Sequence, residues 1–167
     1  MEQNIVLIGM PGSGKTTVGL ALAALTGREA IDTDQRIQAR TGRTCGDIIR
    51  QDGEPAFRAL EAEEAAAAGR QSGKVILTGG GVIKTPANYE ALRQNGRVYH
   101  LVRDLDKLPT EGRPLSQATS LTQLWAEREP LYARFRDVLI DNNGRSPEET
   151  AAAIWEEFCE HFSDQRA

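Results

Sequence analysis

The sequence predicts an α/β fold, a three-layer sandwich in which helices cover both faces of a mainly parallel, five-stranded sheet. Short apolar runs alternate with longer segments of helical spacing, which is typical of parallel strands joined by right-handed crossovers. With 167 residues, of which 40% are hydrophobic, the chain is long enough to bury one sizeable core. We therefore expect a single domain over residues 1–167. The predicted strands are Ile5–Ile8, Glu29–Ile31, Val75–Leu77, Val98–Val102 and Val138–Ile140.

The first two helices are predicted from apolar spacing and from the residues that begin and end helices. The first is expected to end at Gly27, because glycine readily adopts the left-handed conformation of a helix C-cap. The second is expected to begin near Gln35, with Thr33 or Asp34 as its N-cap, and to stop at Gly42.

The remaining helices follow the same reasoning. A short helix is predicted over Thr44–Gln51, with Ile48 and Ile49 facing inward. The alanine- and glutamate-rich stretch Glu54–Ala68 has a high intrinsic helix propensity. Further helices are predicted over Pro86–Gln94, Leu121–Phe135 and Pro147–Phe162.

A glycine-rich motif, GMPGSGKTT, lies between the first strand and the first helix. It fits G-x-x-x-x-G-K-[ST], the phosphate-binding loop, in the strand-to-helix context that this motif requires. Its backbone N–H groups would surround an anion, Lys15 would reach the β- and γ-phosphates, and Thr16 would ligate Mg²⁺. We therefore predict that the chain binds a nucleoside triphosphate. The residues expected to hold it are Gly12, Ser13, Gly14, Lys15, Thr16 and Thr17.

Two aspartates follow the second predicted strand, in the order Asp32-Thr33-Asp34. Alternate side chains of an extended segment point the same way, so both carboxylates could face one cleft. One could hold a Mg²⁺-bound water, and the other could orient or deprotonate an attacking hydroxyl. Helix capping explains one such carboxylate but not two.

Arginines and a glycine triplet supply the other candidate site residues. Arg58 and Glu61 have the spacing of a helical ion pair, although surface pairing is the alternative explanation for that arginine. Gly79–Gly81 follows a strand, where three glycines suggest close approach of a ligand or of another backbone. Arg113 and Arg128 each precede a proline closely, and arginine suits planar carboxylates and phosphates.

Composition and charge exclude several classes of function. A net charge of −4 argues against a broad surface for nucleic acid or membrane. The two cysteines, Cys45 and Cys159, are too few for a disulfide framework or a zinc site, and we expect both to be buried or half-buried. The sequence shows no signal peptide or membrane-spanning run, so a cytoplasmic location is expected. Residues 104–117 lack clear periodicity and are expected to form a mobile lid.

Together these features resemble the shikimate kinase family over nearly the whole chain. The family has a P-loop NTPase fold of the nucleoside monophosphate kinase type. The resemblance implies transfer of the γ-phosphoryl group of ATP to the 3-hydroxyl of shikimate, a step toward chorismate and the aromatic amino acids. The matching pieces, in order, are GMPGSGKTT, DTD, GEPAFRALE, TGGG, GRPL and EREPLY.

The resemblance also implies roles on the acceptor side. Asp34 would contact the reacting hydroxyl as base or orienting group. Arg58 and Arg128 would grip the carboxylate of shikimate. The glycines Gly79, Gly80 and Gly81 would line its site, with the Gly80 backbone offered to a ring hydroxyl.

On the nucleotide side, the resemblance implies that Lys15 is the phosphate lysine and that ATP binds with Mg²⁺. Asp32 would meet the metal through water, beside Thr16. Arg113 would close onto the phosphates from the lid, and Arg145 would lie near adenine. The family is commonly monomeric, and a monomer is expected here.

Two other classes of function remain open from the residues. One is a kinase of the same fold with another acceptor, such as gluconate or a nucleoside monophosphate. Both are disfavoured by the Asp32/Asp34 pair together with Arg58, the glycine triplet and Arg128. The other is a module that binds ATP without catalysis, which would bind Mg·ATP and transfer nothing.

Overall fold

The computed structural model describes residues 2–108 and 115–165, with the side chains of 115–120 excepted. Its sheet is parallel throughout and has the strand order β2-β3-β1-β4-β5. This arrangement confirms the predicted five-stranded α/β fold. The strands are β1 (Asn4–Ile8), β2 (Ala30–Asp32), β3 (Val75–Leu77), β4 (Gly96–Val102) and β5 (Val138–Asp141).

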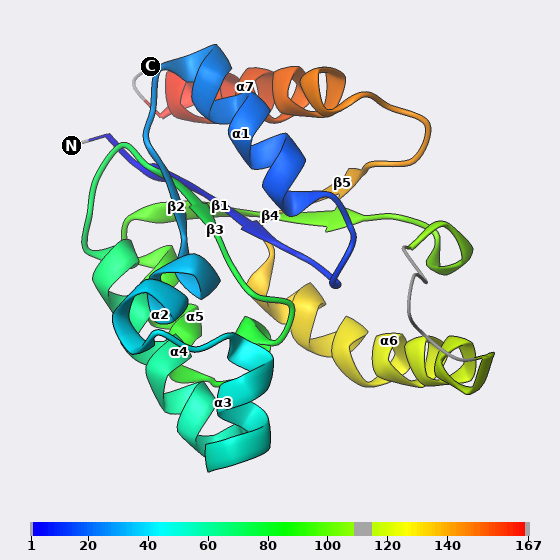
Figure 1. Ribbon diagram of the computed structural model, residues 1–167. Helices are drawn as coiled ribbons and strands as arrows, with labels where there is room; N and C mark the ends of the chain where they lie inside the picture. The colour runs from blue at the N-terminus through cyan, green and yellow to red at the C-terminus, as the bar shows by residue number, and fades with distance from the viewer. Residues whose placement is uncertain (1, 109–114, 166–167) are drawn as a thin grey trace.

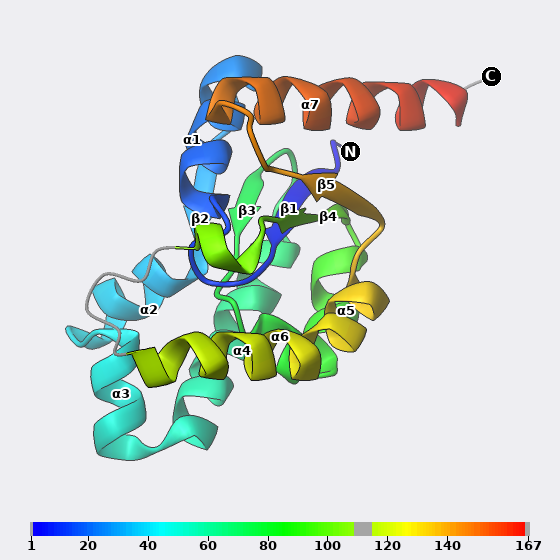
Figure 2. The same cartoon turned by 90° about the vertical axis from the view of Figure 1, so that its right-hand side faces the viewer.

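Helices cover both faces of the sheet, as Figures 1 and 2 show. Helices α1 and α7 lie together on one face, and the other helices lie on the opposite face, where α6 runs beneath β4 and β5. The helices are α1 (Lys15–Thr26), α2 (Thr33–Thr41), α3 (Cys45–Asp52), α4 (Glu54–Gly69), α5 (Ala87–Arg93), α6 (Leu115–Phe135) and α7 (Pro147–Asp164), with short 3₁₀ turns η1 (Val82–Lys84) and η2 (Leu105–Lys107).

The central strand β1 shows how the core is divided between the two faces. Ile5 and Leu7 pack in the cluster that includes Val18 of α1 and Ile154 of α7. Val6 and Ile8 point the other way, because successive side chains of a strand alternate between faces. Each residue of β1 is fully buried, as expected for a strand covered by helices on both sides. Because β1 is held in the middle of the sheet, its carboxyl end lies beside those of its neighbours β3 and β4.

The start of α2 differs from the prediction. Asp32, rather than Thr33 or Asp34, is the N-cap, because its carboxylate accepts a hydrogen bond from the Gln35 N–H at 3.1 Å. Asp34 therefore lies in the first helical turn. The expectation that both aspartates share an extended segment was wrong: Asp32 ends the strand and Asp34 already belongs to the helix.

Two expectations about burial were also wrong. Ile48 is fully buried, whereas Ile49 is 37% exposed, because only one of two adjacent residues on a short helix faces the core. Cys45 is half-buried as expected, but Cys159 is exposed on α7. Gly27 and Gly42 do end their helices in the left-handed conformation, with φ of 70° and 69°.

The structure adds one finding on membranes. Within the described ranges, none of the helices combines the length and the apolar character needed to cross a bilayer.

Candidate active site at the carboxyl edge of the sheet

The phosphate-binding motif forms a tight loop between β1 and α1. Gly14 ends the loop as the N-cap of α1. Its backbone φ of 99° is one that residues with a side chain rarely adopt. The Lys15 ammonium lies back over the loop and donates to the carbonyls of Gly9 at 2.5 Å and Met10 at 3.0 Å. Thr17 donates to the Gly14 carbonyl at 3.2 Å. The loop, the helix N-terminus and the lysine together make an anion site.

The charge on Lys15 is sensitive to its surroundings. Burial, with a smaller contribution from the nearby Arg128 cation, lowers the pKa of Lys15 to about 8. The carboxylates of Asp34 and Asp32 oppose this shift. Lys15 thus lies within electrostatic reach of both aspartates and of Arg128, which comes from a distant part of the chain, so these motifs meet in one region.

Asp34 supplies a largely buried carboxylate to the site. Its Oδ1 atom is buried and has no hydrogen-bond partner among the described residues. Burial raises the pKa of Asp34, with a further contribution from Asp32, while Lys15 and Arg58 act in the opposite direction. A carboxylate with a raised pKa and a free oxygen is suited to accept a proton from a bound hydroxyl.

The glycine triplet lies against the charged side chains. A Cβ on Gly79 would be 2.9 Å from Asp34 Oδ1 and 3.0 Å from Glu61 Oε2. A Cβ on Gly81 would be 2.5 Å from the Arg58 guanidinium nitrogens. A side chain at either position would displace charged groups of α2 and α4 that approach the backbone closely, which accounts for glycine at 79 and 81.

Arg58 is held in place by acidic residues of its own helix. Its Nη1 atom donates to Glu61 Oε1 at 2.9 Å, and its Nε atom donates to Glu54 Oε1 at 3.2 Å. The Glu61 side chain is 1% exposed, and burial raises its pKa while Arg58 lowers it. The predicted helical pair is confirmed, and it is a buried pair rather than a surface one.

Arg128 reaches the same region from α6. A Cβ on Gly80 would be 3.2 Å from Arg128 Nη1, and the buried Nε atom of Arg128 has no partner in the described structure. Sequence reasoning missed Tyr132, one turn later, whose hydroxyl donates to the Gly80 carbonyl at 2.5 Å. Burial raises the pKa of Tyr132 to about 12, so it remains a donor. The only available signal was its place in the EREPLY motif.

Four buried polar atoms of this region lack hydrogen-bond partners among the described residues. Buried polar groups are almost always hydrogen-bonded in folded proteins, so such a concentration requires an explanation. A bound ligand with hydroxyl, carboxylate and phosphate groups would supply the missing partners. The four atoms are Ser13 Oγ, Asp34 Oδ1, Glu61 Oε2 and Arg128 Nε.

The residues present also fit a magnesium ion. Thr16 is exposed in the first turn of α1, and Asp32 uses only its Oδ1 atom to cap α2. Mg²⁺ is usually held by one or two such oxygen ligands together with substrate phosphates and water. In the described part of the chain no cluster of three or more histidine, cysteine or acidic side chains could hold a metal without a substrate.

Two predicted site residues are not brought into this group. Arg113 lies outside the described residues, as do the other residues of 109–114 within the predicted lid. Arg145 is exposed in the connection between β5 and α7, where hydrogen bonds from Asn143 and, to a smaller extent, the Arg145 charge lower the pKa of Asp141.

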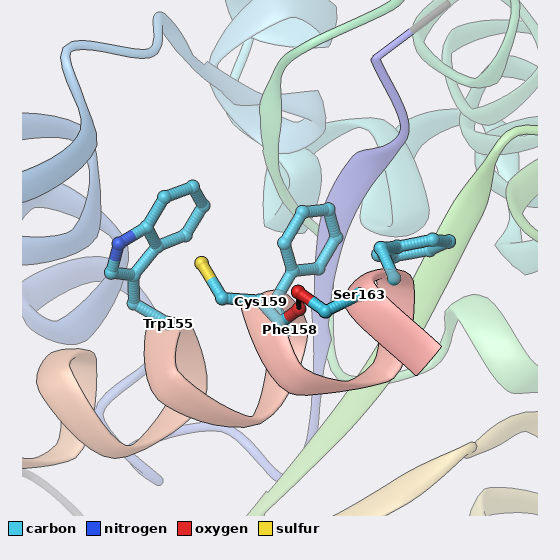
Figure 3. A pocket seen from close by; sticks show the side chains of 5 residues that line it. Trp155, Phe158, Cys159 and Ser163 are labelled. Atoms are coloured by element: carbon cyan, nitrogen blue, oxygen red, sulfur yellow. Dashed lines mark hydrogen bonds between the residues drawn. The ribbon is translucent and has the colours of Figure 1, made fainter. Parts of the chain in front are cut away.

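A separate apolar pocket lies along α7, as Figure 3 shows. Among the described residues, none of the predicted site residues lines it, and none of its lining side chains is acidic or basic. Its lining residues are Trp155, Phe158, Cys159, Phe162 and Ser163.

Comparisons with known proteins agree with the geometry. The chain matches the family model described as shikimate kinase over residues 11–159. It is 40% identical over 168 residues to a shikimate kinase from Symbiobacterium thermophilum, covering 94% of this chain and 97% of that protein. A solved structure of shikimate kinase from Acinetobacter baumannii in complex with shikimate has a TM-score of 0.88 and 33% identity, covering 96% of this chain and 95% of that one. A gluconokinase from Sinorhizobium meliloti, at 18% identity and a TM-score of 0.60 over 99% of this chain and 98% of that one, shares the fold.

Proposed function

The chain belongs to the shikimate kinase family, and from that premise we propose how its residues carry out the reaction. The activity is ATP-dependent phosphorylation of shikimate at the 3-hydroxyl, giving shikimate 3-phosphate and ADP. The observation that carries the proposal is that Asp34, Arg128 and Arg58 approach the successive glycines Gly79, Gly80 and Gly81. This arrangement suits an acceptor that has both a carboxylate and a reactive hydroxyl.

Shikimate, the acceptor, is bound by two arginine side chains and by the backbone of three glycines. Arg58, kept in place by Glu61, and Arg128 bind the carboxylate of shikimate from two helices, since a guanidinium matches a planar carboxylate. Gly79, Gly80 and Gly81 line the ring, with the Gly80 carbonyl fixed by the Tyr132 hydroxyl.

The reacting hydroxyl lies at Asp34. The free Oδ1 atom of Asp34 accepts its hydrogen bond and then its proton as the oxygen attacks the γ-phosphorus. The raised pKa of Asp34 makes the carboxylate a stronger base than an exposed aspartate.

The nucleotide is held by the phosphate-binding loop. Amides of Gly12, Ser13 and Gly14, with the hydroxyl and amide groups of Thr16 and Thr17, surround the phosphates, and Lys15 leaves the loop carbonyls to contact them. Thr16 and, through water, Asp32 hold Mg²⁺. When bound, the ion neutralises charge on the β- and γ-phosphates.

Two residues beyond this group have proposed roles as well. Arg145 lies beside adenine, and Arg113 contacts the phosphates during transfer as part of a lid at 104–117. We further propose that the chain acts as one domain and as a monomer.

The direct test is ADP formation by the purified protein in Mg·ATP, with shikimate, with gluconate and with no acceptor. We expect a rate that depends on shikimate and that gluconate does not reproduce. The product should be shikimate 3-phosphate by mass spectrometry. A rate that is the same in all three reactions, with ATP still bound, would show a nucleotide-binding module without this transferase activity.

The lowered pKa of Lys15 predicts how activity depends on pH. The protonated lysine binds phosphate, and its pKa in the free protein is about 8. Because kcat/KM reports the ionisation of the free enzyme, kcat/KM for ATP should fall above pH 8 by about tenfold per pH unit. Initial rates at low ATP between pH 6 and pH 10 would measure this fall.

Lys15→Arg is the matched control, since arginine keeps its charge throughout this range. Its kcat/KM for ATP should be lower than that of the natural protein but flat above pH 8. A fall of the same size in Lys15→Arg would assign the alkaline limb to another group.

A further inference from the structure

Asn142, directly after β5, joins two elements far apart in the sequence. Its side chain is buried, with 3% of the residue exposed. The Nδ2 atom donates to the Ser13 carbonyl at 2.8 Å, and the Oδ1 atom accepts from the Thr150 hydroxyl of α7 at 2.6 Å. Its own backbone N–H donates to Val102 at the end of β4 at 2.9 Å. Asn142 therefore connects two strand ends and α7 with the phosphate-binding loop.

The partners of Asn142 permit only one orientation of its amide. The Ser13 carbonyl can only accept a hydrogen bond, so the NH₂ group must face it. The Oδ1 atom then faces the fully buried Thr150, whose hydroxyl donates to it. Exchanging the two ends of the amide would place Oδ1 against the Ser13 carbonyl, two acceptors, and the bond to the loop would be lost.

The bond to Ser13 fixes the direction of the peptide group between Ser13 and Gly14. In a trans peptide the C=O and N–H bonds point in opposite directions, and the described chain has no cis peptide bonds. With the Ser13 carbonyl held by Asn142, the Gly14 N–H points to the other side of the loop. A Cβ on Gly14 would be 2.5 Å from Asn142 Nδ2, so the amide packs directly against this peptide.

We propose that Asn142, supported by Thr150, is a positioning residue for phosphate binding. It holds the Ser13–Gly14 peptide so that the Gly14 N–H is aimed at the phosphates before nucleotide arrives. The inference rests on the proposed function only in that the loop binds ATP. Asn142 itself does not touch the nucleotide; it acts through the backbone of the loop.

Asn142→Asp tests the proposal, because it keeps the shape of the side chain and turns the donor at Ser13 into an acceptor. Loss of one such hydrogen bond should weaken binding of Mg·ADP by about tenfold or more. KM for ATP should rise by a similar factor, with KM for shikimate unchanged. Isothermal titration with Mg·ADP and steady-state kinetics would measure these changes.

Asn4→Asp is the matched control at the opposite end of the sheet. Asn4 is fully buried and also bridges two backbone groups, donating to Gln71 O at 2.7 Å and accepting from Lys74 N–H at 2.8 Å. Both variants should lose thermal stability, but only Asn142→Asp should lose ADP affinity. Equal ADP affinity in the two folded variants would overturn the proposal.

Thr150→Val is the second variant, in case Asn142→Asp does not fold. It leaves Asn142 in place but removes the hydroxyl that orients its amide, so we expect ADP binding weakened by about threefold. Unchanged binding in Thr150→Val and in any folded Asn142 variant would overturn the inference. Failure of the natural protein to bind Mg·ADP would instead refute the proposed function, so the two failures are distinguishable.

Discussion

Replacing Asp34 by asparagine should lower kcat for shikimate phosphorylation by about 10²–10⁴-fold, the usual contribution of a general base. Asparagine fills the same space but cannot accept the proton of the acceptor hydroxyl. Binding of Mg·ADP should be unchanged at pH 6, where Lys15 is protonated even without the Asp34 carboxylate that supports its charge. Steady-state rates at saturating ATP and shikimate, with titration of Mg·ADP, would measure both effects.

Stability separates this effect from misfolding. The pKa of Asp34 is raised in the folded protein, so its ionised form opposes folding at pH values above that pKa. Asp34→Asn should therefore have a Tm equal to or higher than that of the natural protein at pH 7. Asp164→Asn, at the exposed end of α7, is the control and should retain full activity. A Tm loss that accompanies the activity loss would argue against a catalytic role for Asp34.

Local chemistry made much of the fold and site predictable from the sequence. The apolar runs identified the strands, and the glycine spacing identified the phosphate-binding loop. The Arg58–Glu61 pair was predictable because residues three apart lie side by side on a helix. Asp34 was assigned to the site, but for a reason the structure corrects: it lies in a helical turn and does not share a strand with Asp32.

Sequence patterns did not predict hydrogen bonds between segments that are distant in the chain. The bond from Asn142 to Ser13 spans 129 residues, and the Tyr132 hydroxyl meets Gly80 across 52 residues. Neither side chain belongs to a type or spacing that signals such a partner. The glycine triplet was recognisable as unusual, but which charged groups lie against it depends on how α2, α4 and α6 pack together.

Replacing Arg58 by methionine should have two separable effects. KM for shikimate should rise by about 100-fold or more, because a charged partner of the substrate carboxylate is lost. The variant should also lose about 3 kcal/mol of unfolding free energy at pH 8, since Glu61 remains buried without its partner. Urea denaturation and steady-state kinetics would measure the two effects.

The destabilisation of Arg58→Met should depend on pH. The rise in KM for shikimate should persist even under conditions that restore the stability of the variant. Burial already raises the pKa of Glu61, and removal of Arg58 raises it further. The carboxylate then takes up a proton as pH falls, so the destabilisation should be smaller at pH 5 than at pH 8. Arg40→Met, which removes a more exposed arginine that also pairs with glutamates of α4, should destabilise the protein much less than Arg58→Met and leave KM for shikimate unchanged.

The double variant Arg58→Met/Glu61→Gln distinguishes a direct role of Arg58 from an indirect one. A neutral amide at residue 61 removes the uncompensated charge, so most of the lost unfolding free energy should return. KM for shikimate should stay as high as in Arg58→Met, because neither substituted side chain carries a positive charge and only Arg128 remains to pair with the carboxylate. A double variant that regains both stability and shikimate affinity would show that Arg58 supports the fold of α4 and that the substrate carboxylate is bound elsewhere.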